Sequence, residues 1–364
     1  MNWQELMEVE QARRALEAHH TPDYSQGYVP FVEPPRIVAA VLDDGCDVEH
    51  PQLTNVISQS INFERPSHSL LTSNSSHGTL SAGLVAGEAN GTFLGGVARK
   101  SETLNTALIV AKYNPDSDND EAMLRELCEQ GARVISCSWG YGPGYFSNKS
   151  ATAKADRLRR LVKELSEEHN TLFVFAAGNE GKPLVYKDFS FADYGIVVAA
   201  TLNRENHPEI RSTSCNYGAG ITLCAPGSDS TGLCLVSTSN REHGNARATG
   251  STHLDFHANT SAACPMVAGV AALVMAANPD LSARQVKTVL CGTADRIDLG
   301  CNVEVTINKT RQRAKWTTAT AALSAGQKEG LDQTLWGNSY NLFYGFGRVN
   351  ARAAVNEALR LKNQ

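Results

Sequence analysis

The chain has 364 residues, of which 42 % are hydrophobic and 20 % charged, and its formal net charge is −5. This composition is typical of a globular protein with one large domain or two smaller ones, and the acidic balance argues against wholesale nucleic-acid binding. The first ten residues lack the basic and apolar regions of a secretory signal peptide. We find no charge-free apolar run of about 18 residues and therefore expect no membrane span.

The nine cysteines are scattered, and none forms a Cys-x-x-Cys pair. Because the number is odd and several cysteines lie in apolar runs, the pattern favours reduced, buried thiols over a disulfide framework. Together with the missing signal peptide, this favours a cytoplasmic location.

Apolar runs and helical periodicities alternate along most of the chain. We expect buried strands at 37–42, 106–111, 133–138, 172–177, 196–200 and 222–225. We expect helices at 3–18, 77–86, 119–130, 153–168, 260–277 and 350–361. The alternation predicts an α/β fold with a mainly parallel central sheet and helices on both faces. Residues 1–35 are interpreted as an N-terminal helix with an extended, proline-rich lead-in, and 36–364 as one domain with a less regular insertion at about 296–340.

Residue types suited to acyl transfer lie at the ends of these elements. Asp43 and Asn179 follow predicted parallel strands, at the sheet edge where active sites form. His77 and Ser261 open helices, and unpaired N–H groups at a helix N-terminus suit a hydroxyl whose reaction creates an oxyanion. Serine needs a base such as histidine, and a buried carboxylate fixes the tautomer of that base. Taken singly, each of these residues could instead cap a helix or form a turn.

Four motifs containing these residues come in a recognisable order: Leu42-Asp43-Asp44-Gly45, His77-Gly78-Thr79, Ala176-Ala177-Gly178-Asn179-Glu180-Gly181 and Thr260-Ser261-Ala262-Ala263-Cys264-Pro265. The chain resembles the subtilisin-like serine proteases, or subtilases, in which the triad follows the order Asp, His, Ser. The doubled aspartate, Ser136–Gly140 and Tyr344–Gly347 resemble the kexin and furin branch. The resemblance covers about residues 36–298 and 343–360.

The resemblance implies a subtilisin-like three-layer fold and a serine endopeptidase acting on polypeptides. In that family's arrangement Asp43 orients the imidazole, His77 is general base and then acid, and Ser261 attacks the peptide carbonyl. The oxyanion would be bound by the Asn179 side chain and the Ser261 backbone N–H. Ser138, Trp139 and Gly140 would form an edge that pairs with the substrate backbone.

Acidic residues near the implied subsites suggest a mild preference for basic peptides. Asp44 resembles the furin-branch carboxylate of the second subsite, Glu180 lies near the rim of the first, and Asp116–Glu121 near the fourth. The acidic residues that the furin branch has after Gly140 are replaced by Tyr141-Gly142-Pro143. The sequence therefore does not predict strict cleavage after arginine.

The implied chemistry requires no cofactor. The sequence does, however, contain residues that could bind structural metal ions. The loop Glu88–Leu94, with Asn90, resembles the family's tight calcium loop, but Gln52 stands where that site usually has a carboxylate. Calcium usually takes carboxylates among six to eight oxygen ligands. The sequence therefore does not decide whether this loop binds a structural calcium ion. His243, His253 and His257 could ligate zinc, although loop histidines are more often solvated.

Two departures leave other functions open. Asn259 replaces the glycine that the family usually has two residues before Ser261; asparagine tolerates positive φ, but a spoiled turn would leave a peptide-binding pseudoprotease. Because of the irregular insertion, a second alternative remains: a specialised processing protease or transpeptidase that acts on one partner. Only 42 residues precede Asp43, too few for a folding prodomain, so the chain is either a mature fragment or an intracellular subtilase that folds unaided. The missing signal peptide favours the second. The kcat/KM of such an enzyme should fall as the pH drops through the His77 pKa, about 6–7 if unperturbed.

Overall fold

The computed structural model describes residues 2–20, 33–64, 76–113, 119–140, 149–184, 193–202, 209–228, 235–240, 254–323, 328 and 331–364. The expected extended lead-in over 21–32, Asp116, Tyr141–Pro143, His243 and His253 lie outside these residues. Cys234 does as well, whereas the eight described cysteines are all buried and free. For those eight, the prediction of reduced, buried thiols is confirmed.

The strands of the described part are β1 (Arg36–Asp43), β2 (Ile57–Asn62), β3 (Asn105–Lys112), β4 (Val134–Cys137), β5 (Leu172–Ala176), β6 (Ile196–Leu202), β7 (Ile210–Arg211), β8 (Leu223–Pro226), β9 (Leu235–Thr238), β10 (Leu254–His257), β11 (Asn302–Ile307), β12 (Thr310–Lys315), β13 (Thr317–Thr318) and β14 (Ser339–Tyr340). The helices are α1 (Trp3–Leu6), α2 (Val9–His20), α3 (His77–Ala86), α4 (Asp120–Glu129), α5 (Lys149–Glu168), α7 (Asn259–Ala277), α8 (Ala283–Gly292), α9 (Ala319–Ala322), the 3-10 helix η3 (Gln333–Leu335) and α11 (Ala351–Lys362).

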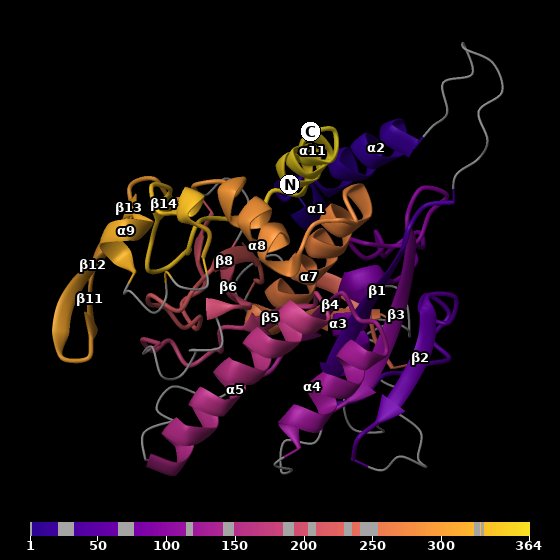
Figure 1. The fold of residues 1–364 in the computed structure, drawn as a ribbon, viewed down its shortest axis with the longest axis horizontal. Helices are drawn as coiled ribbons and strands as arrows, with labels where there is room; N and C mark the ends of the chain where they lie inside the picture. Colours follow the sequence, from indigo (N-terminus) through magenta and orange to yellow (C-terminus); the bar gives the residue numbers. More distant parts are fainter. Residues whose placement is uncertain are drawn as a thin grey trace.

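The central sheet has the strand order β2-β3-β1-β4-β5-β6-β7, with β8 also paired to β6. All neighbours are parallel except β6 and β7. Every residue of β5 and β6 is buried, so both faces of these strands are covered. The α/β fold with a mainly parallel sheet is confirmed (Figure 1).

Helix α7 lies at the centre of the molecule. It packs against β1, β4, β5, β6 and β8 and against α3 and α11 (Figure 1). Contrary to our expectation from the sequence, these 19 residues are long and apolar enough to cross a membrane. In the fold, however, 94 % of the most apolar 18-residue stretch of this helix is buried. Such burial is the property of a core helix, because apolar side chains all round need covering on every side.

The two ends of the described chain meet. The backbone N–H of Ala351, at the start of α11, donates to the Met7 carbonyl at 2.8 Å, and α2 packs along α11 (Figure 1). The single helix expected over 3–18 is divided in two, because Glu8 has a φ of +54°, in the left-handed region.

Several elements were not predicted. Sequence patterns did not indicate β2, the β9–β10 hairpin or α8, and they marked 296–340 only as irregular. The insertion contains the antiparallel β11–β12 hairpin, whose turn residues Asn308 and Lys309 have φ values of +51° and +62°. These are the positive φ values of a two-residue hairpin turn. The hairpin projects from the body of the molecule (Figure 1).

Candidate active site

Asp43 and His77 form a short hydrogen-bonded pair. Asp43 is the last residue of β1, and His77 is the first of α3. His77 Nδ1 lies 2.7 Å from Asp43 Oδ1, which also accepts the Asp44 backbone N–H at 2.8 Å. Asp43 is buried, whereas the His77 side chain is 37 % exposed. A carboxylate can only accept, so Nδ1 carries the proton and Nε2 is the nitrogen able to act as a base.

Charge determines the titration of this pair. Burial would raise the pKa of Asp43, but the charge of His77 and its hydrogen bond lower it. Burial would likewise lower the pKa of His77, but the charge and hydrogen bond of Asp43, with the charge of Asp44, raise it to about 9. The two carboxylates thus hold the pKa of His77 above the value of about 6–7 that an unperturbed histidine would have.

The start of α3 fits closely under the loop that follows β1. A Cβ atom on Gly78 would lie 2.0 Å from the Gly45 carbonyl oxygen, so only glycine fits after His77. The Gly78 N–H donates to Asp44 Oδ1 at 2.8 Å. A carboxylate at a helix N-terminus is favoured by the helix dipole. This contact ties the two motifs together and fixes where α3 begins.

Ser261 lies in the first turn of α7, and Ser138 contacts it twice. The Ser138 Oγ donates to the Ser261 carbonyl at 2.9 Å, and the Ser261 Oγ donates to the Ser138 carbonyl at 3.3 Å. The first bond has a cause in the sequence. Pro265 has no N–H to donate to the carbonyl four residues before it, so the Ser261 carbonyl is available to Ser138.

Asn179 is oriented by the residue before the serine. Its Oδ1 accepts the Thr260 backbone N–H at 3.1 Å and the Thr260 Oγ1 hydroxyl at 2.8 Å. Thr260 is fully buried, while Asn179 is exposed. Binding of the oxygen in this way fixes the orientation of the Asn179 amide group. Its N–H groups are hydrogen-bond donors held in place before any substrate arrives.

Asn259 takes the conformation that its place in the motif requires. Its φ is +58°, in the left-handed region where glycine is usual and asparagine is tolerated. Its Oδ1 also accepts the Ser214 Oγ hydroxyl at 3.0 Å. The turn therefore forms with asparagine, which is one of the two outcomes that the sequence left open.

The residues expected to bind substrate lie around this edge of the sheet. Trp139 is half-buried: its Nε1 donates to the Leu42 carbonyl at 2.7 Å, and its ring stacks on Tyr113 with centroids 4.1 Å apart. Gly140 is exposed beside it. Glu180 is exposed, and its Oε2 accepts an Asn216 amide N–H. Trp139 thus has a packing role that the sequence did not indicate.

Two residues beneath the pair were missed as parts of this site. Ser81 lies one helical turn after His77 and donates to Asp43 Oδ2 at 3.1 Å. His257, considered only as a zinc ligand, is buried and contacts the His77 ring edge to face, with centroids 5.0 Å apart. The spacing of four residues from His77 to Ser81 places both on one helix face, which was a usable signal for Ser81.

The loop that resembles a calcium site is closed by amide groups. Asn90 Oδ1 accepts the backbone N–H groups of Thr92 and Phe93 at 3.0 and 2.7 Å. Gln4 Nε2 donates to the Gly95 carbonyl at 2.8 Å. Gln52 Oε1 is buried and accepts no hydrogen bond from the described residues. An orphaned buried oxygen fits a cation, but it is neutral, whereas calcium sites usually include carboxylates.

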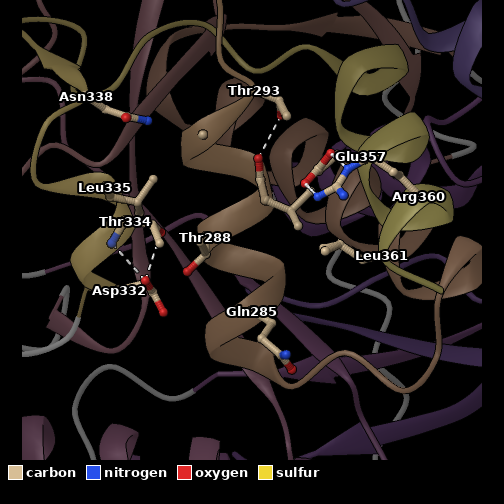
Figure 2. Close-up of a pocket in the computed structure, with 12 residues that line it drawn as sticks. Gln285, Thr288, Thr293, Asp332, Thr334, Leu335, Asn338, Glu357, Arg360 and Leu361 are labelled. Carbon is tan, nitrogen blue, oxygen red and sulfur yellow. Dashed lines mark hydrogen bonds and ion pairs between the residues drawn. The ribbon is translucent and has the colours of Figure 1, made fainter. Parts of the chain in front are cut away.

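A cavity of about 540 Å³ lies apart from these residues. Figure 2 shows α8, η3 and α11 around it, and none of the predicted site residues belongs to these elements. Two of its acidic side chains already have partners: Glu357 is paired with Arg360, and Asp332 accepts from Thr334.

Comparison with known proteins agrees with this geometry. A family model described as the subtilase family matches residues 35–347. A calcium-dependent protease of Trichormus variabilis is 26 % identical over 355 residues, which cover 88 % of this chain and 46 % of that protein. Kexin of Saccharomyces cerevisiae is 27 % identical over 269 residues, covering 69 % of this chain and 30 % of kexin. This chain thus spans less than half the length of either relative.

Solved structures share the fold. A serine protease of Aeromonas sobria, in complex with a chaperone, superposes with a TM-score of 0.66 at 22 % identity, covering 89 % of this chain and 60 % of that one. A lanthipeptide protease has a TM-score of 0.63 at 20 % identity and covers 88 % of both chains. At these identities the likeness concerns the fold alone. Since the family model covers most of the chain and its four motifs converge at one edge of the sheet, the chain belongs to the subtilase family.

Proposed function

We propose that this chain is a serine endopeptidase that cleaves polypeptides through an acyl-enzyme at Ser261. The observation that carries the proposal is the 2.7 Å contact between Asp43 Oδ1 and His77 Nδ1, because it leaves Nε2 as the basic nitrogen. The anchoring of Asn179 by Thr260 supports it independently. Family membership supports the same reaction class.

The reaction would begin with transfer of the Ser261 hydroxyl proton to His77 Nε2 as Oγ attacks the peptide carbonyl carbon. The negative charge of the tetrahedral intermediate would be stabilised by the Asn179 amide and the Ser261 N–H. His77 would then protonate the departing amine nitrogen as the C–N bond breaks. Water would repeat the sequence on the ester and release the acid.

The hydrogen bond of Ser261 to Ser138 belongs to a resting rotamer in this proposal. A hydroxyl has one proton, so a proton donated to the Ser138 carbonyl is not donated to His77. Rotation about the Cα–Cβ bond would redirect it to Nε2, since serine has three staggered χ1 positions. Binding of a peptide along Ser138–Gly140 would favour this change, because the substrate backbone competes for the same edge.

The proposed specificity is a mild preference for basic peptides. Exposed Glu180 and half-exposed Asp44 contribute negative charge at this edge of the sheet. Asp44 also accepts the Gly78 N–H, so its carboxylate is fixed in position. A peptide-library digest should show enrichment of lysine or arginine at one or more subsites. The absence of any enrichment would disprove this preference.

We further propose a weak structural calcium site at the loop containing Asn90. The support is the orphaned Gln52 Oε1 and the calcium dependence for which the Trichormus variabilis relative is named. Because the Gln52 amide oxygen is neutral where calcium sites usually have a carboxylate, the dissociation constant should lie in the range of about 10⁻⁴–10⁻³ M that is typical of weak extracellular calcium modules. Bound calcium would stabilise this loop and take no part in the chemistry.

One labelling experiment tests the proposed activity. A fluorophosphonate probe reacts with an activated serine, so it should label the wild-type chain and fail to label the Ser261→Ala variant. Labelling that persists in the variant, or that never occurs in a folded wild-type chain, would overturn the enzyme assignment. Peptide capture without labelling would instead indicate a peptide-binding pseudoprotease.

Product analysis then separates hydrolysis from its alternatives. Mass spectrometry of products formed with an added amine should show free carboxyl termini if the enzyme is a hydrolase. Amide-linked products would indicate a transpeptidase. Cleavage of one protein among many would indicate a specialised processing protease, for which the projecting β11–β12 hairpin offers an additional surface (Figure 1).

A further inference from the structure

Beneath the Asp43–His77 pair lies a second, buried set of polar groups. The Ser81 Oγ lies 3.1 Å from Asp43 Oδ2 and 3.2 Å from His257 Nε2. Ser81 and His257 are both buried, at 0 % and 4 % exposure. A buried polar group destabilises the fold unless it is hydrogen-bonded. Each of these two contacts must therefore have one donor and one acceptor, which limits where the protons can lie.

The proton positions follow from what each group can do. The Asp43 carboxylate is charged and only accepts, so the single Ser81 proton is directed to Oδ2 at 3.1 Å rather than to the Ser138 Oγ at 3.4 Å, and Ser81 then accepts from His257 Nε2. We propose that His257 is a positioning residue of the active site: as the neutral Nε2–H tautomer it donates to Ser81, and Ser81 in turn donates to Asp43. The inference rests on the proposed function, because it concerns the same catalytic groups.

This arrangement fixes both oxygens of the carboxylate. Oδ1 accepts from His77 and from the Asp44 N–H, and Oδ2 accepts from Ser81. A carboxylate held at both oxygens cannot rotate about its Cβ–Cγ bond, so the lone pair facing His77 Nδ1 stays aligned. Triad function depends on this alignment, because the carboxylate selects the tautomer of the base.

Contact between the rings fixes His77 from another side. The ring planes of His77 and His257 are 89° apart, with centroids 5.0 Å apart. The charged or titratable groups around His257 are Asp43 on β1 and His77 on α3, with Asp255 two residues before it on β10. Burial and the charge of His77 lower the pKa of His257 to about 3, against the opposing effects of Asp43 and of a backbone hydrogen bond at Ser261. A neutral ring adds no second positive charge beside the imidazolium that forms during catalysis.

The first test needs no catalysis. In the Ser261→Ala variant, nitrogen-15 NMR should show His257 as a neutral Nε2–H tautomer between about pH 6 and pH 8, where an ordinary histidine titrates. In the same variant, Ser81→Ala should raise the pKa of His77, because Asp43 loses a donor and attracts the His77 proton more strongly. An Nδ1–H tautomer, a protonated ring, or an unchanged His77 pKa would overturn the proposal.

The second test uses kinetics and a double-mutant cycle. Ser81→Ala and His257→Phe should each lower kcat about tenfold, with KM within about twofold, and the double variant should lose no more than either alone. His257→Gln retains an N–H donor and should recover most of the activity. Additive losses, or a glutamine variant no better than phenylalanine, would show that His257 does not act through Ser81.

A stability control separates positioning from loss of packing. Leu254→Ala removes a buried side chain from the same strand and should lower the melting temperature while leaving the acid limb of the pH profile in place. His257→Phe should move that limb to higher pH. If the wild type is not labelled by the fluorophosphonate although the NMR tautomer is as expected, the proposed function fails and the hydrogen-bond assignment stands.

Discussion

In two parts of the molecule, an asparagine or glutamine replaces the residue that subtilases usually have at that position. The nucleophile turn, residues 258–261, has Asn259 in place of glycine. The calcium-type loop, Gln52 with residues 87–96, has Gln52 in place of a carboxylate. Asn259 adopts a φ of +58° and accepts from Ser214. Gln52 Oε1 is buried without a donor from the described residues.

The difference shows how to interpret a departure from a family pattern. A replacement that finds both a permitted backbone conformation and a hydrogen-bond partner preserves the local structure, as at Asn259. A replacement that leaves a buried oxygen unpaired costs about 1–3 kcal/mol, unless a group outside the chain binds it. We therefore expect the nucleophile turn to function as it stands and the calcium-type loop to depend on solution conditions.

The largest effect should come from the donor oriented by the nucleophile turn. Asn179→Leu should lower kcat by about 10²–10³ with little change in KM, a magnitude taken from the corresponding loss in subtilisin. The reason is that only the transition state has an oxyanion to bind. Steady-state kinetics on a peptide substrate checks it. Thr260→Val, which removes the hydroxyl but leaves the amide, should give a smaller loss, and an Asn179→Leu enzyme of normal kcat would contradict the assignment.

The next effect is on pH dependence. In the proposed mechanism only neutral His77 can accept the Ser261 proton. Because the pKa of His77 is raised to about 9, kcat/KM should rise with pH up to about that value. Asp44→Asn removes one of the charges that raise this pKa and should move the acid limb to lower pH. Profiles between about pH 6 and pH 10 test both statements. An acid limb at or below the ordinary histidine value of about 6.5 in the wild type, unmoved by Asp44→Asn, would contradict them.

Much of the fold and the site could be predicted because the relevant signals are local. Continuous apolar runs such as 172–177 and 196–200 predicted strands covered on both faces, and the structure has strands there. The motifs around Asp43, His77, Asn179 and Ser261 follow strands or open helices, which brings them to one edge of the sheet. The splitting of the first helix at Glu8 and the β9–β10 hairpin lacked such signals.

What escaped prediction depends on contacts between distant residues. Ser81 and His257 are 176 positions apart and meet only when α3 packs against β10. The Ser138 side chain was assigned to the substrate edge, yet it donates to a carbonyl freed by Pro265. The His77 pKa could not be derived from composition, because it results from two carboxylates placed beside the ring by the fold.

A smaller effect is expected at Asn259 itself. Asn259→Ala should destabilise the fold by about 1–2 kcal/mol, because alanine at positive φ is strained and the Ser214 hydroxyl loses its acceptor. Asn259→Gly, which relieves the strain but also lacks the acceptor, should be nearly neutral. Denaturant unfolding measures both. If alanine and glycine at this position gave equal stability, backbone conformation would not be what Asn259 supplies.

The smallest effect should separate the calcium-type loop from the nucleophile turn. Calcium at about ten times its dissociation constant would stabilise the folded chain by about 1.4 kcal/mol, so adding millimolar calcium should raise the melting temperature slightly, and a chelator should reverse it. Gln52→Asp supplies a charged oxygen at the orphaned position and should produce the same stabilisation at lower calcium concentration. Gln52→Leu removes the oxygen and should abolish the response. A wild-type melting temperature indifferent to calcium, with Gln52→Leu at least as stable, would mean that the amide oxygen is buried there without a ligand.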